Sequence, residues 1–349
     1  NLYATLLKRN FEFTNESGII AMIHPNTFMF IKTFEGVRKY ILEQSRIDLL
    51  VDYGLDRVNL FGGDILLDSN CWYVIDKNKT NRDGVYFNIS TNQQEKFKKE
   101  SLNQAVIDFI NHDENKRVIT LNQNKFKFIS GIPFIYWISD EFREKFKGHS
   151  AKDMIANCQG LATTNNNRFL RFWWEINDRL PSSQSSKWFL YAKGGPFKKW
   201  NGNLWLLVNF ENNGQEIKNE VVRKYPYLNG KTEYVVKNEA YYFKEGISYS
   251  ASGQKGPSFR ILPEGCIFDV GGSCIFPLGK YKNINYILAL YNSKLTNYIL
   301  NCLNPTVNVQ AGDIERIPFL VPPENLEKEV EKCSQMNVEI VKYINSTMI

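Results

Sequence analysis

The sequence predicts an α/β fold that continues into a mixed, mainly β module with C-terminal helices. Residues 1–90 alternate helical and strand patterns, and residues 151–322 contain many short apolar runs separated by Gly, Asn and Pro. Residues 323–349 repeat apolar positions at three- and four-residue steps. We therefore expect four parts: the end of a doubly wound sheet (1–90), a connector (91–150), a β-rich module (151–322) and a terminal helix (323–349).

The first part has a regular order of elements. We expect a helix over 2–11, a strand over 18–25, an amphipathic helix over 34–44, and strands over 47–54 and 69–78. The strand "GIIAMIHP" is continuously apolar, which is typical of a strand covered on both faces. Helix, strand, helix, strand, strand is the order of the distal part of a Rossmann-like sheet, whose early strands would precede Asn1.

The remaining parts are less regular. In the connector we expect a helix and a short aromatic strand within "FISGIPFIYWISDEF". In the β-rich module, "NLWLLVNF", "EYVVKNEAYYF" and "GCIFDVGGSCIF" read as strands, and "YILALYNSKLTNYILNCL" reads as a helix.

Composition narrows the class of protein. The 349 residues are 43% hydrophobic and 14% aromatic, which indicates a folded chain. The six cysteines form no C-x-x-C pair and there are only three histidines, so we expect no metal site, and free thiols fit a reducing cytoplasm. No apolar run approaches the roughly 20 residues that span a bilayer, so we expect no membrane segment. The chain begins at Asn1 and reads as a piece of a longer protein.

The segment "QGLATTNNNRFLRFWW", residues 159–174, combines small polar side chains, two arginines and four aromatic rings. Between Asn166 and Trp200 there are seven Lys or Arg and two acidic residues, and five of the seven tryptophans lie between 166 and 205. A basic, aromatic patch is typical of a nucleic-acid surface. From composition alone, a hairpin corner with core aromatics and turn-forming polar residues is favoured.

Several ordered motifs resemble the gamma-class N6-adenine DNA methyltransferases, including type IIG restriction-modification enzymes and the methyltransferase of BREX phage-exclusion systems. The N-terminal matches are "NLYATLL", "SGIIAMIHPNTFMF", an arginine in "FEGVRKYILE" and "VNLFGGDILLDSNCWYVI". The C-terminal matches resemble target recognition domains: "QGLATTNNNRFLRFWWE", "KGGPFKKWNGN", "GISYSASGQKGPSFRILPEG", "IFDVGGSCIF", "LALYNSK" and "NVQAGDIERIPF". The usual T-G-D-N is replaced by Thr163, Thr164, Asn165 and Asn166.

The resemblance implies a fold and a reaction. The chain would be the C-terminal half of such an enzyme: the distal part of the methyltransferase sheet followed by a DNA target recognition domain. The family's glycine-rich S-adenosylmethionine loop and Asn-Pro-Pro-Tyr motif are absent from these residues. S-adenosylmethionine would thus be the cofactor of the parent enzyme and would not be bound by this chain alone. The strand over 18–25 would then present an apolar edge to the missing N-terminal half.

The resemblance also implies site residues. Phe61 corresponds to the family's phenylalanine that stacks on the flipped adenine. The partner would be double-stranded DNA, read by base-edge contacts and held by phosphate contacts. The residues expected at that interface are Thr163, Asn165, Asn167, Arg168, Arg171, Lys193, Lys198, Lys199, Trp200, Ser250, Gln254, Lys255 and Arg260.

Two alternatives remain open at this point. The chain could be a non-catalytic DNA specificity module that acts with a separate catalytic partner. A carbohydrate-binding β module is a third interpretation, because Trp and Asn also suit sugars. DNA binding separates the first two interpretations from the third.

Overall fold

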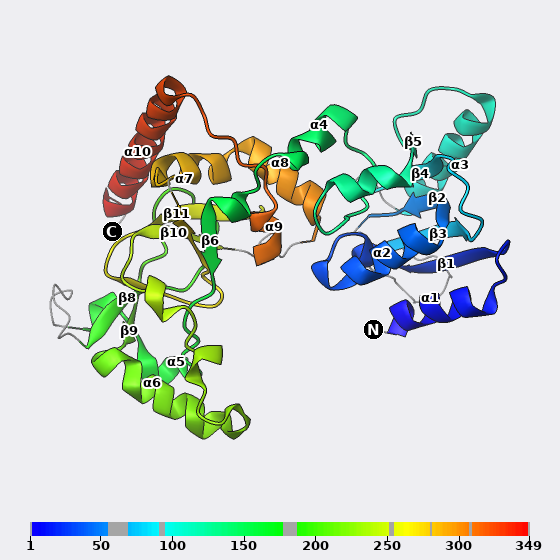
Figure 1. Cartoon of the computed structure of the whole chain (residues 1–349). Helices are drawn as coiled ribbons and strands as arrows, with labels where there is room; N and C mark the ends of the chain where they lie inside the picture. The colour runs from blue at the N-terminus through cyan, green and yellow to red at the C-terminus, as the bar shows by residue number, and fades with distance from the viewer. Residues whose placement is uncertain are drawn as a thin grey trace. The chain divides into compact units, whose positions relative to one another are not determined.

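The chain folds into two compact units in this computed structural model (Figure 1). The structure describes residues 2–54, 69–90, 95–176, 187–250, 255–279, 281–306 and 309–347. Unit 1 comprises residues 1–148 with 302–306, and unit 2 comprises residues 149–301 with 307–349. Each unit has its own apolar core.

Unit 1 is built around a five-stranded sheet in the order β1-β3-β2-β4-β5. The strands are β1 (Ile19–Pro25), β2 (Arg46–Asp52), β3 (Asn70–Asp76), β4 (Gly84–Asn88) and β5 (Val118–Leu121). β3 is antiparallel to both β1 and β2, whereas β4 is parallel to β2 and antiparallel to β5. The helices are α1 (Leu2–Phe13), α2 (Glu35–Gln44), α3 (Glu95–Asn111) and α4 (Asp140–Glu144). The expected helix and strand order through β3 is confirmed.

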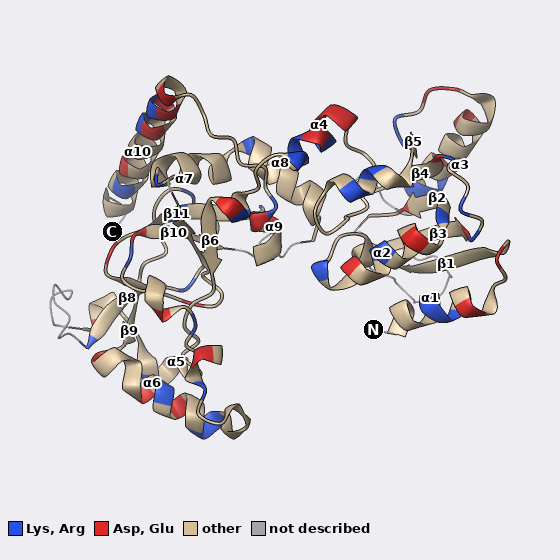
Figure 2. Ribbon diagram, in the orientation of Figure 1, with Lys and Arg blue, Asp and Glu red and all other residues tan. Residues whose placement is uncertain are grey.

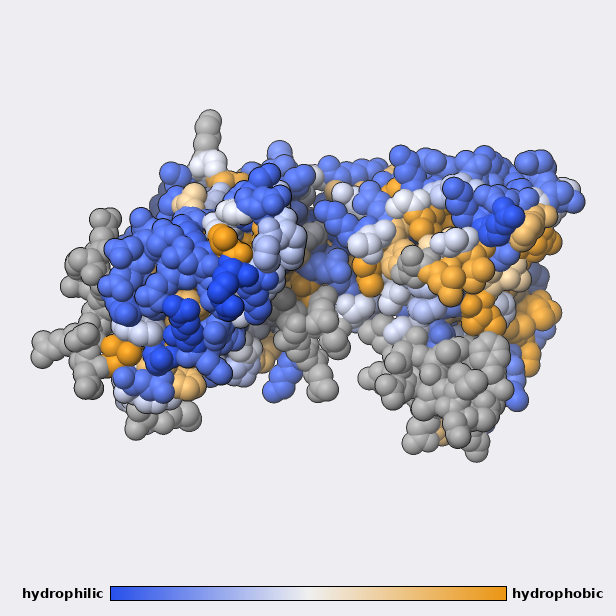
Figure 3. All heavy atoms as spheres, turned by 90° about the horizontal axis from the view of Figure 1, so that it is seen from below, coloured by the Kyte–Doolittle hydropathy of each residue, from blue (hydrophilic) through white to orange (hydrophobic). Residues whose placement is uncertain are grey.

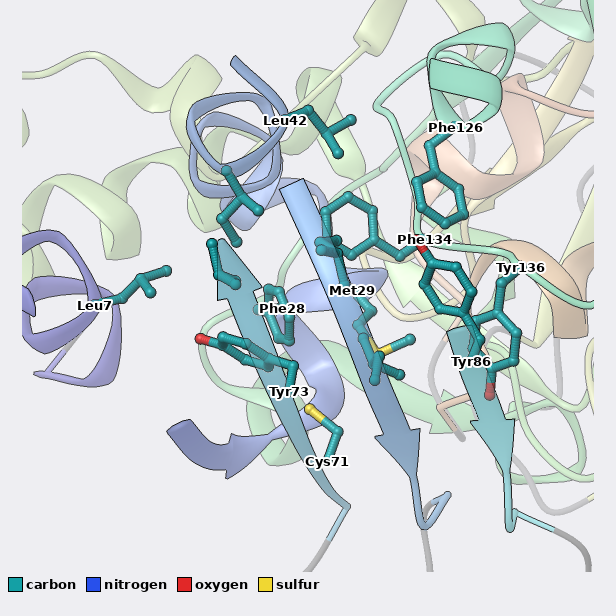
Figure 4. Packing of buried hydrophobic residues seen from close by; sticks show 14 of the residues in the cluster. Leu7, Phe28, Met29, Leu42, Cys71, Tyr73, Tyr86, Phe126, Phe134 and Tyr136 are labelled. Carbon is teal, nitrogen blue, oxygen red and sulfur yellow. The ribbon is translucent and has the colours of Figure 1, made fainter. Parts of the chain in front are cut away.

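The main core of unit 1 lies on one face of this sheet. Leu7 of α1 and Leu42 of α2 are buried there together with a cluster of rings that includes Phe28, Tyr73 and Tyr136 (Figure 4). The opposite face has a smaller core in which Ala105 of α3 is fully buried. Each large apolar side chain buried in these cores contributes about 1.5–3 kcal/mol.

The expectation that residues 18–25 form a strand covered on both faces is wrong. In β1 the side chains alternate: Ile20 and His24 are buried, whereas Ile19 and Ile23 are 65% and 47% exposed. Among the described residues, β1 lies at the end of the sheet and pairs with β3 alone. Figure 3 shows apolar residues gathered on one face of unit 1.

The aromatic strand expected within residues 128–142 is also absent from the structure. The segment is irregular between a 3₁₀ helix (Gln123–Phe128) and α4. Its carbonyl groups are satisfied by buried arginines instead of a neighbouring strand. Arg38 Nη2 donates to the Gly131 carbonyl at 2.6 Å, and Arg143 Nη1 donates to the Ile135 carbonyl at 2.9 Å.

Unit 2 contains two four-stranded sheets, in the orders β11-β10-β13-β6 and β12-β8-β9-β7. The strands are β6 (Ile155–Cys158), β7 (Leu170–Phe172), β8 (Trp188–Ala192), β9 (Leu206–Asn209), β10 (Gly246–Ser250), β11 (Ser258–Leu262), β12 (Cys266–Phe268) and β13 (Cys274–Pro277). The helices are α5 (Asn166–Phe169), α6 (Glu211–Lys224), α7 (Ile284–Asn292), α8 (Lys294–Leu303), α9 (Ala311–Glu315) and α10 (Glu324–Thr347). The mixed architecture with C-terminal helices is the expected one.

Two local expectations in unit 2 need correction. Residues 233–243 were expected to form a strand but instead form 3₁₀ turns. Asn238 takes a positive φ of 55°, which interrupts an extended backbone. Residues 286–303 form two helices, because Ser293 is extended and its hydroxyl accepts a hydrogen bond from Thr296 N at 3.0 Å, which starts a new helix. None of the helices within the described ranges is long and apolar enough to cross a membrane.

Candidate functional site

The carboxyl ends of β1, β2 and β4 lie at one edge of the unit 1 sheet. β1 and β2 are both antiparallel to β3 and therefore run in the same direction, which β4 shares. In open α/β sheets, ligands bind outside this edge. Asn26 follows β1 here, and Tyr53 and Gly54 follow β2.

A buried polar network occupies this edge, centred on Asp52. Its Oδ1 accepts hydrogen bonds from Asn26 Nδ2 and from the Gly54 amide, both at 2.9 Å, and its Oδ2 accepts one from the Tyr136 hydroxyl at 3.2 Å. Burial raises the pKa of Asp52, and these three donors together with nearby Lys98 counteract only part of that rise. Asp52 is only 3% exposed, and our site prediction did not include this network.

Asn26 holds both ends of the segment that contains Phe61. Its backbone amide donates to the Ser69 carbonyl at 2.5 Å, and its side chain donates to the Gly54 carbonyl at 3.1 Å. Phe61 itself lies outside the described residues. Gly54 has a φ of 78°, and a Cβ there would lie 2.8 Å from Ser90 Cβ, so only glycine fits this turn. The ends of the Phe61 segment are thus fixed at the carboxyl edge of the sheet.

A second candidate site is a hollow of about 570 Å³ on unit 2. Asn167 and Arg171 are predicted site residues that line it, and Lys193 contributes a second cationic group. The complete lining is Asn166, Asn167, Leu170, Arg171, Phe172, Glu175, Lys193 and Leu206. The structure thus brings together three of the predicted residues, from α5, β7 and the chain after β8.

Thr163, Asn165 and Arg168 have structural partners beside this hollow. The buried Thr163 hydroxyl donates to Asn166 Oδ1 at 2.6 Å, and Asn165 caps α5 by accepting from the Arg168 amide at 3.2 Å. The Arg168 guanidinium pairs with Glu216 and Glu220 of α6, at 3.3 and 3.6 Å. Figure 2 shows acidic as well as basic residues along α6. The charge of Arg168 is therefore partly neutralised within unit 2.

A third group of predicted residues lies around Phe197. The ammonium groups of Lys199 and Lys255 each lie 5.9 Å from the centre of its ring. Lys255 and Lys198 are exposed, whereas Lys199 donates to the Asn292 carbonyl at 2.8 Å and burial lowers its pKa. Gln254 lies outside the described residues.

Three further predicted residues form hydrogen bonds within unit 2: Trp200, Ser250 and Arg260. Arg260 is 1% exposed, and its Nη2 donates to the Ser250 hydroxyl at 3.0 Å, which in turn donates to the Gly195 carbonyl at 2.9 Å. The Trp200 amide donates to the Phe259 carbonyl at 2.8 Å. The prediction that Ser250 and Arg260 contact DNA does not fit this placement, because neither side chain reaches the surface.

The glycines near Lys193 also have a structural explanation. A Cβ on Gly194 would lie 2.9 Å from the Gly271 carbonyl oxygen, and one on Gly272 would lie 2.5 Å from the Gly194 amide. These glycines let two turns of unit 2 approach each other.

Comparison with known proteins identifies relatives along nearly the whole chain. The family model described as "Eco57I restriction-modification methylase" matches residues 1–61. The sequence is 30% identical over 346 residues, 97% of this chain, to "Adenine-specific methyltransferase BrxX" of Escherichia coli O9:H4 (strain HS). The chain is thus similar in sequence to an adenine-specific methyltransferase. It is also 27% identical over 330 residues, 91% of this chain, to "Adenine-specific methyltransferase PglX" of Lacticaseibacillus casei (strain Zhang).

The chain spans about a quarter of the length of these relatives, since the matches cover 26% of each. Solved structures share its fold. The type IIL restriction-modification enzyme MmeI in complex with DNA superposes with a TM-score of 0.55 at 11% identity, over 95% of this chain and 43% of that one. The type ISP restriction-modification enzyme LlaBIII bound to DNA gives 0.54 at 14% identity, over 97% and 26%. The resemblance inferred from the sequence motifs is confirmed.

Proposed function

We propose that this chain is the DNA-recognising part of an adenine-specific DNA methyltransferase of a restriction-modification or phage-defence system. The parent enzyme would transfer a methyl group from S-adenosylmethionine to N6 of adenine. The observation that carries this proposal is the homology to BrxX and PglX over at least 91% of the chain. The fold likeness to restriction-modification enzymes solved with DNA supports it.

In this proposal, unit 1 contributes to the site of methyl transfer. Phe61 stacks on the adenine after the base leaves the duplex. Asn26 and Asp52 hold the ends of its segment at the sheet edge where α/β enzymes bind ligands. We assign no residue of this chain to S-adenosylmethionine, and the cofactor would be held by other parts of the complete protein. Those parts would cover the apolar edge of β1.

Unit 2 acts as the target recognition domain. Asn167 has an exposed amide suited to base edges, and Arg171 and Lys193 supply positive charge beside it. Lys198 and Lys255 are exposed cations suited to phosphates. Ser250 and Arg260 are left out of this interface because they are buried.

Two experiments test the proposal. The 349-residue chain should be titrated with duplex DNA at several salt concentrations. The logarithm of the binding constant should fall linearly with the logarithm of the salt concentration. In the parent enzyme, Asn167→Ala should change which sequence is methylated, because a good base contact provides roughly 1–3 kcal/mol of discrimination. Lys198→Ala should weaken binding about equally on all sequences. Salt-independent binding, or no binding at low salt, would count against the interface.

The complete enzyme distinguishes the proposal from its alternative. If the parent is a methyltransferase, Phe61→Ala should reduce methyl transfer much more than DNA binding. If the chain is instead a non-catalytic specificity module, methyl transfer should require a separate protein and should be insensitive to this change.

A further inference from the structure

Three neighbouring aromatic side chains form an exposed corner on unit 2. The rings of Phe172 and Trp174 are stacked, with centres 4.5 Å apart and planes only 7° from parallel. Trp173 lies 5.6 Å from Trp174 at 87°, so its ring stands nearly perpendicular to the stack. All three side chains are exposed, and Trp174 is 57% exposed. Contiguous apolar surface of this kind marks a binding site more often than an inert surface.

The backbone of this aromatic corner is fixed in place. Phe172 pairs with Leu206 across β7 and β9, and its amide donates to Glu175 Oε2 at 2.7 Å. The Trp173 amide donates to the Trp205 carbonyl at 3.0 Å. Because these contacts fix the backbone and the rings of Phe172 and Trp174 stack on each other before any ligand arrives, binding costs less conformational entropy.

The charge beside the aromatic corner favours an anionic ligand. Phe172 lines the 570 Å³ hollow together with Arg171 and Lys193, whose side chains are cationic. The hollow also contains the carboxylate of Glu175, so two cationic side chains face one anionic side chain and the balance of charge is positive. A ligand that matches this surface has a flat apolar face and a negative group close to it, as a nucleotide does.

We propose that the aromatic corner stacks on a single DNA base that has left the duplex, with the adjoining phosphate at Arg171 and Lys193. The proposal rests on the proposed function and adds a ligand to unit 2. In a paired duplex both faces of a base are covered by its neighbours, and only its edges are open in the grooves. A ring such as Trp174 needs an open face, which an unstacked base provides. Trp173 would border the stacked base on one side.

The test uses the 349-residue chain and three labelled DNAs of the same sequence: a paired duplex, that duplex with one extra unpaired nucleotide, and the single strand. Stacking is worth about 1–3 kcal/mol per base, so the unpaired nucleotide should tighten binding by roughly 5- to 150-fold over the paired duplex. Trp174→Ala and Trp174→Leu should both abolish this preference and keep the affinity for the paired duplex. Tyr227→Ala, which removes a 75% exposed ring elsewhere on unit 2, is the matched control and should keep the preference.

The outcomes separate this inference from the proposed function. Equal affinity for the paired and bulged duplexes, or an unchanged preference in either folded Trp174 variant, would overturn the stacking proposal and leave duplex recognition intact. Binding to none of the three DNAs would overturn both. Circular dichroism identifies any variant that fails to fold. Trp174→Phe retains an aromatic ring and should therefore preserve part of the preference for the unpaired nucleotide. Complete loss of that preference in a folded Trp174→Phe chain would count against stacking.

Discussion

The Asn26 side-chain amide donates a 2.9 Å hydrogen bond to the buried carboxylate of Asp52 and thereby joins the first turn after β1 to the last residue of β2. The same amide group also donates to the Gly54 carbonyl, which fixes its orientation, because a flipped amide would place its oxygen against two acceptors. Asn26 Oδ1 is buried and has no hydrogen-bond partner among the residues that the structure describes. This residue therefore serves the network through its donor groups.

We expect Asn26→Ala to reduce the free energy of unfolding of the chain by about 1–3 kcal/mol, because Asp52 and the Gly54 carbonyl would lose a buried donor. Urea unfolding measures this change. Asn103→Ala, at an exposed position of α3, is the control and should stay within about 0.5 kcal/mol of the original chain. Equal stabilities of the two variants would mean that the network contributes nothing.

The raised pKa of Asp52 predicts a pH-dependent stability. An unfolded aspartate loses its proton near about pH 4, whereas burial keeps folded Asp52 protonated to higher pH. Between these two pKa values the folded state binds more protons, so the free energy of unfolding falls as pH rises and then levels off above the folded pKa. Asp52→Asn cannot ionise and should lack this fall. Urea unfolding of both chains from pH 3.5 to 8 tests it, and parallel pH profiles would contradict it.

Arg260→Met and Lys255→Met should have opposite consequences. Burial lowers the pKa of Arg260 to about 10, and its loss would remove hydrogen bonds to Ser250 and to the Ser258 carbonyl. We expect unit 2 to lose roughly 2–4 kcal/mol of stability in Arg260→Met. Lys255→Met should leave stability within about 0.5 kcal/mol and weaken DNA binding. Thermal unfolding and DNA titration measured on both variants would decide, and a stable Arg260→Met chain with weakened binding would reverse our assignment.

Substitutions of different basic residues of unit 2 should change the salt dependence of DNA binding by different amounts. Arg171→Ala and Lys193→Ala should each reduce the log–log salt slope by about 0.9 if each side chain neutralises one phosphate. Arg168→Ala should reduce it less, because Glu216 and Glu220 already pair with that guanidinium. DNA titrations between 50 and 200 mM salt compare the three variants. A larger effect from Arg168 than from Arg171 would show that the ion pairs open on binding.

The exposed side chains of β1 should affect the isolated chain differently from the complete enzyme that we propose. Ile19→Lys combined with Ile23→Lys should reduce self-association of the isolated chain, since charged residues on an edge strand oppose pairing with another chain. In the complete enzyme the same pair should lower stability and methyl transfer if other parts of the protein cover this edge. Val222→Lys, on the exposed side of α6, is the control for both measurements. Sedimentation of the isolated variants reports self-association, and an unaffected complete enzyme would mean that this edge stays uncovered.

Local patterns were sufficient for the regular elements. The spacing of Val37 and Ile41 predicted the helix now described as α2, and the apolar runs predicted β2 and β3. Short-range steric preferences determine such elements, so they can be read from neighbouring residues. The same reasoning placed strands over residues 128–142 and 233–243, and neither strand exists. In the first segment Arg38 donates a hydrogen bond to the Gly131 carbonyl, which therefore needs no neighbouring strand. In the second, the left-handed backbone of Asn238 interrupts the extended conformation.

The sequence by itself determined the order of the main helices and strands, the motifs that resemble those of adenine-specific methyltransferases, and the basic, aromatic character of residues 159–200. Only the tertiary structure decided that Arg260 is buried whereas Arg171 is half-buried at the edge of the hollow, although both were equally plausible DNA contacts in the sequence. It also brought Asn26 to Asp52 across 26 positions and added Tyr136 from 84 positions further along. Burial and side-chain pairing depend on segments that are distant in the chain, whereas hydrophobic periodicity reports only on neighbours.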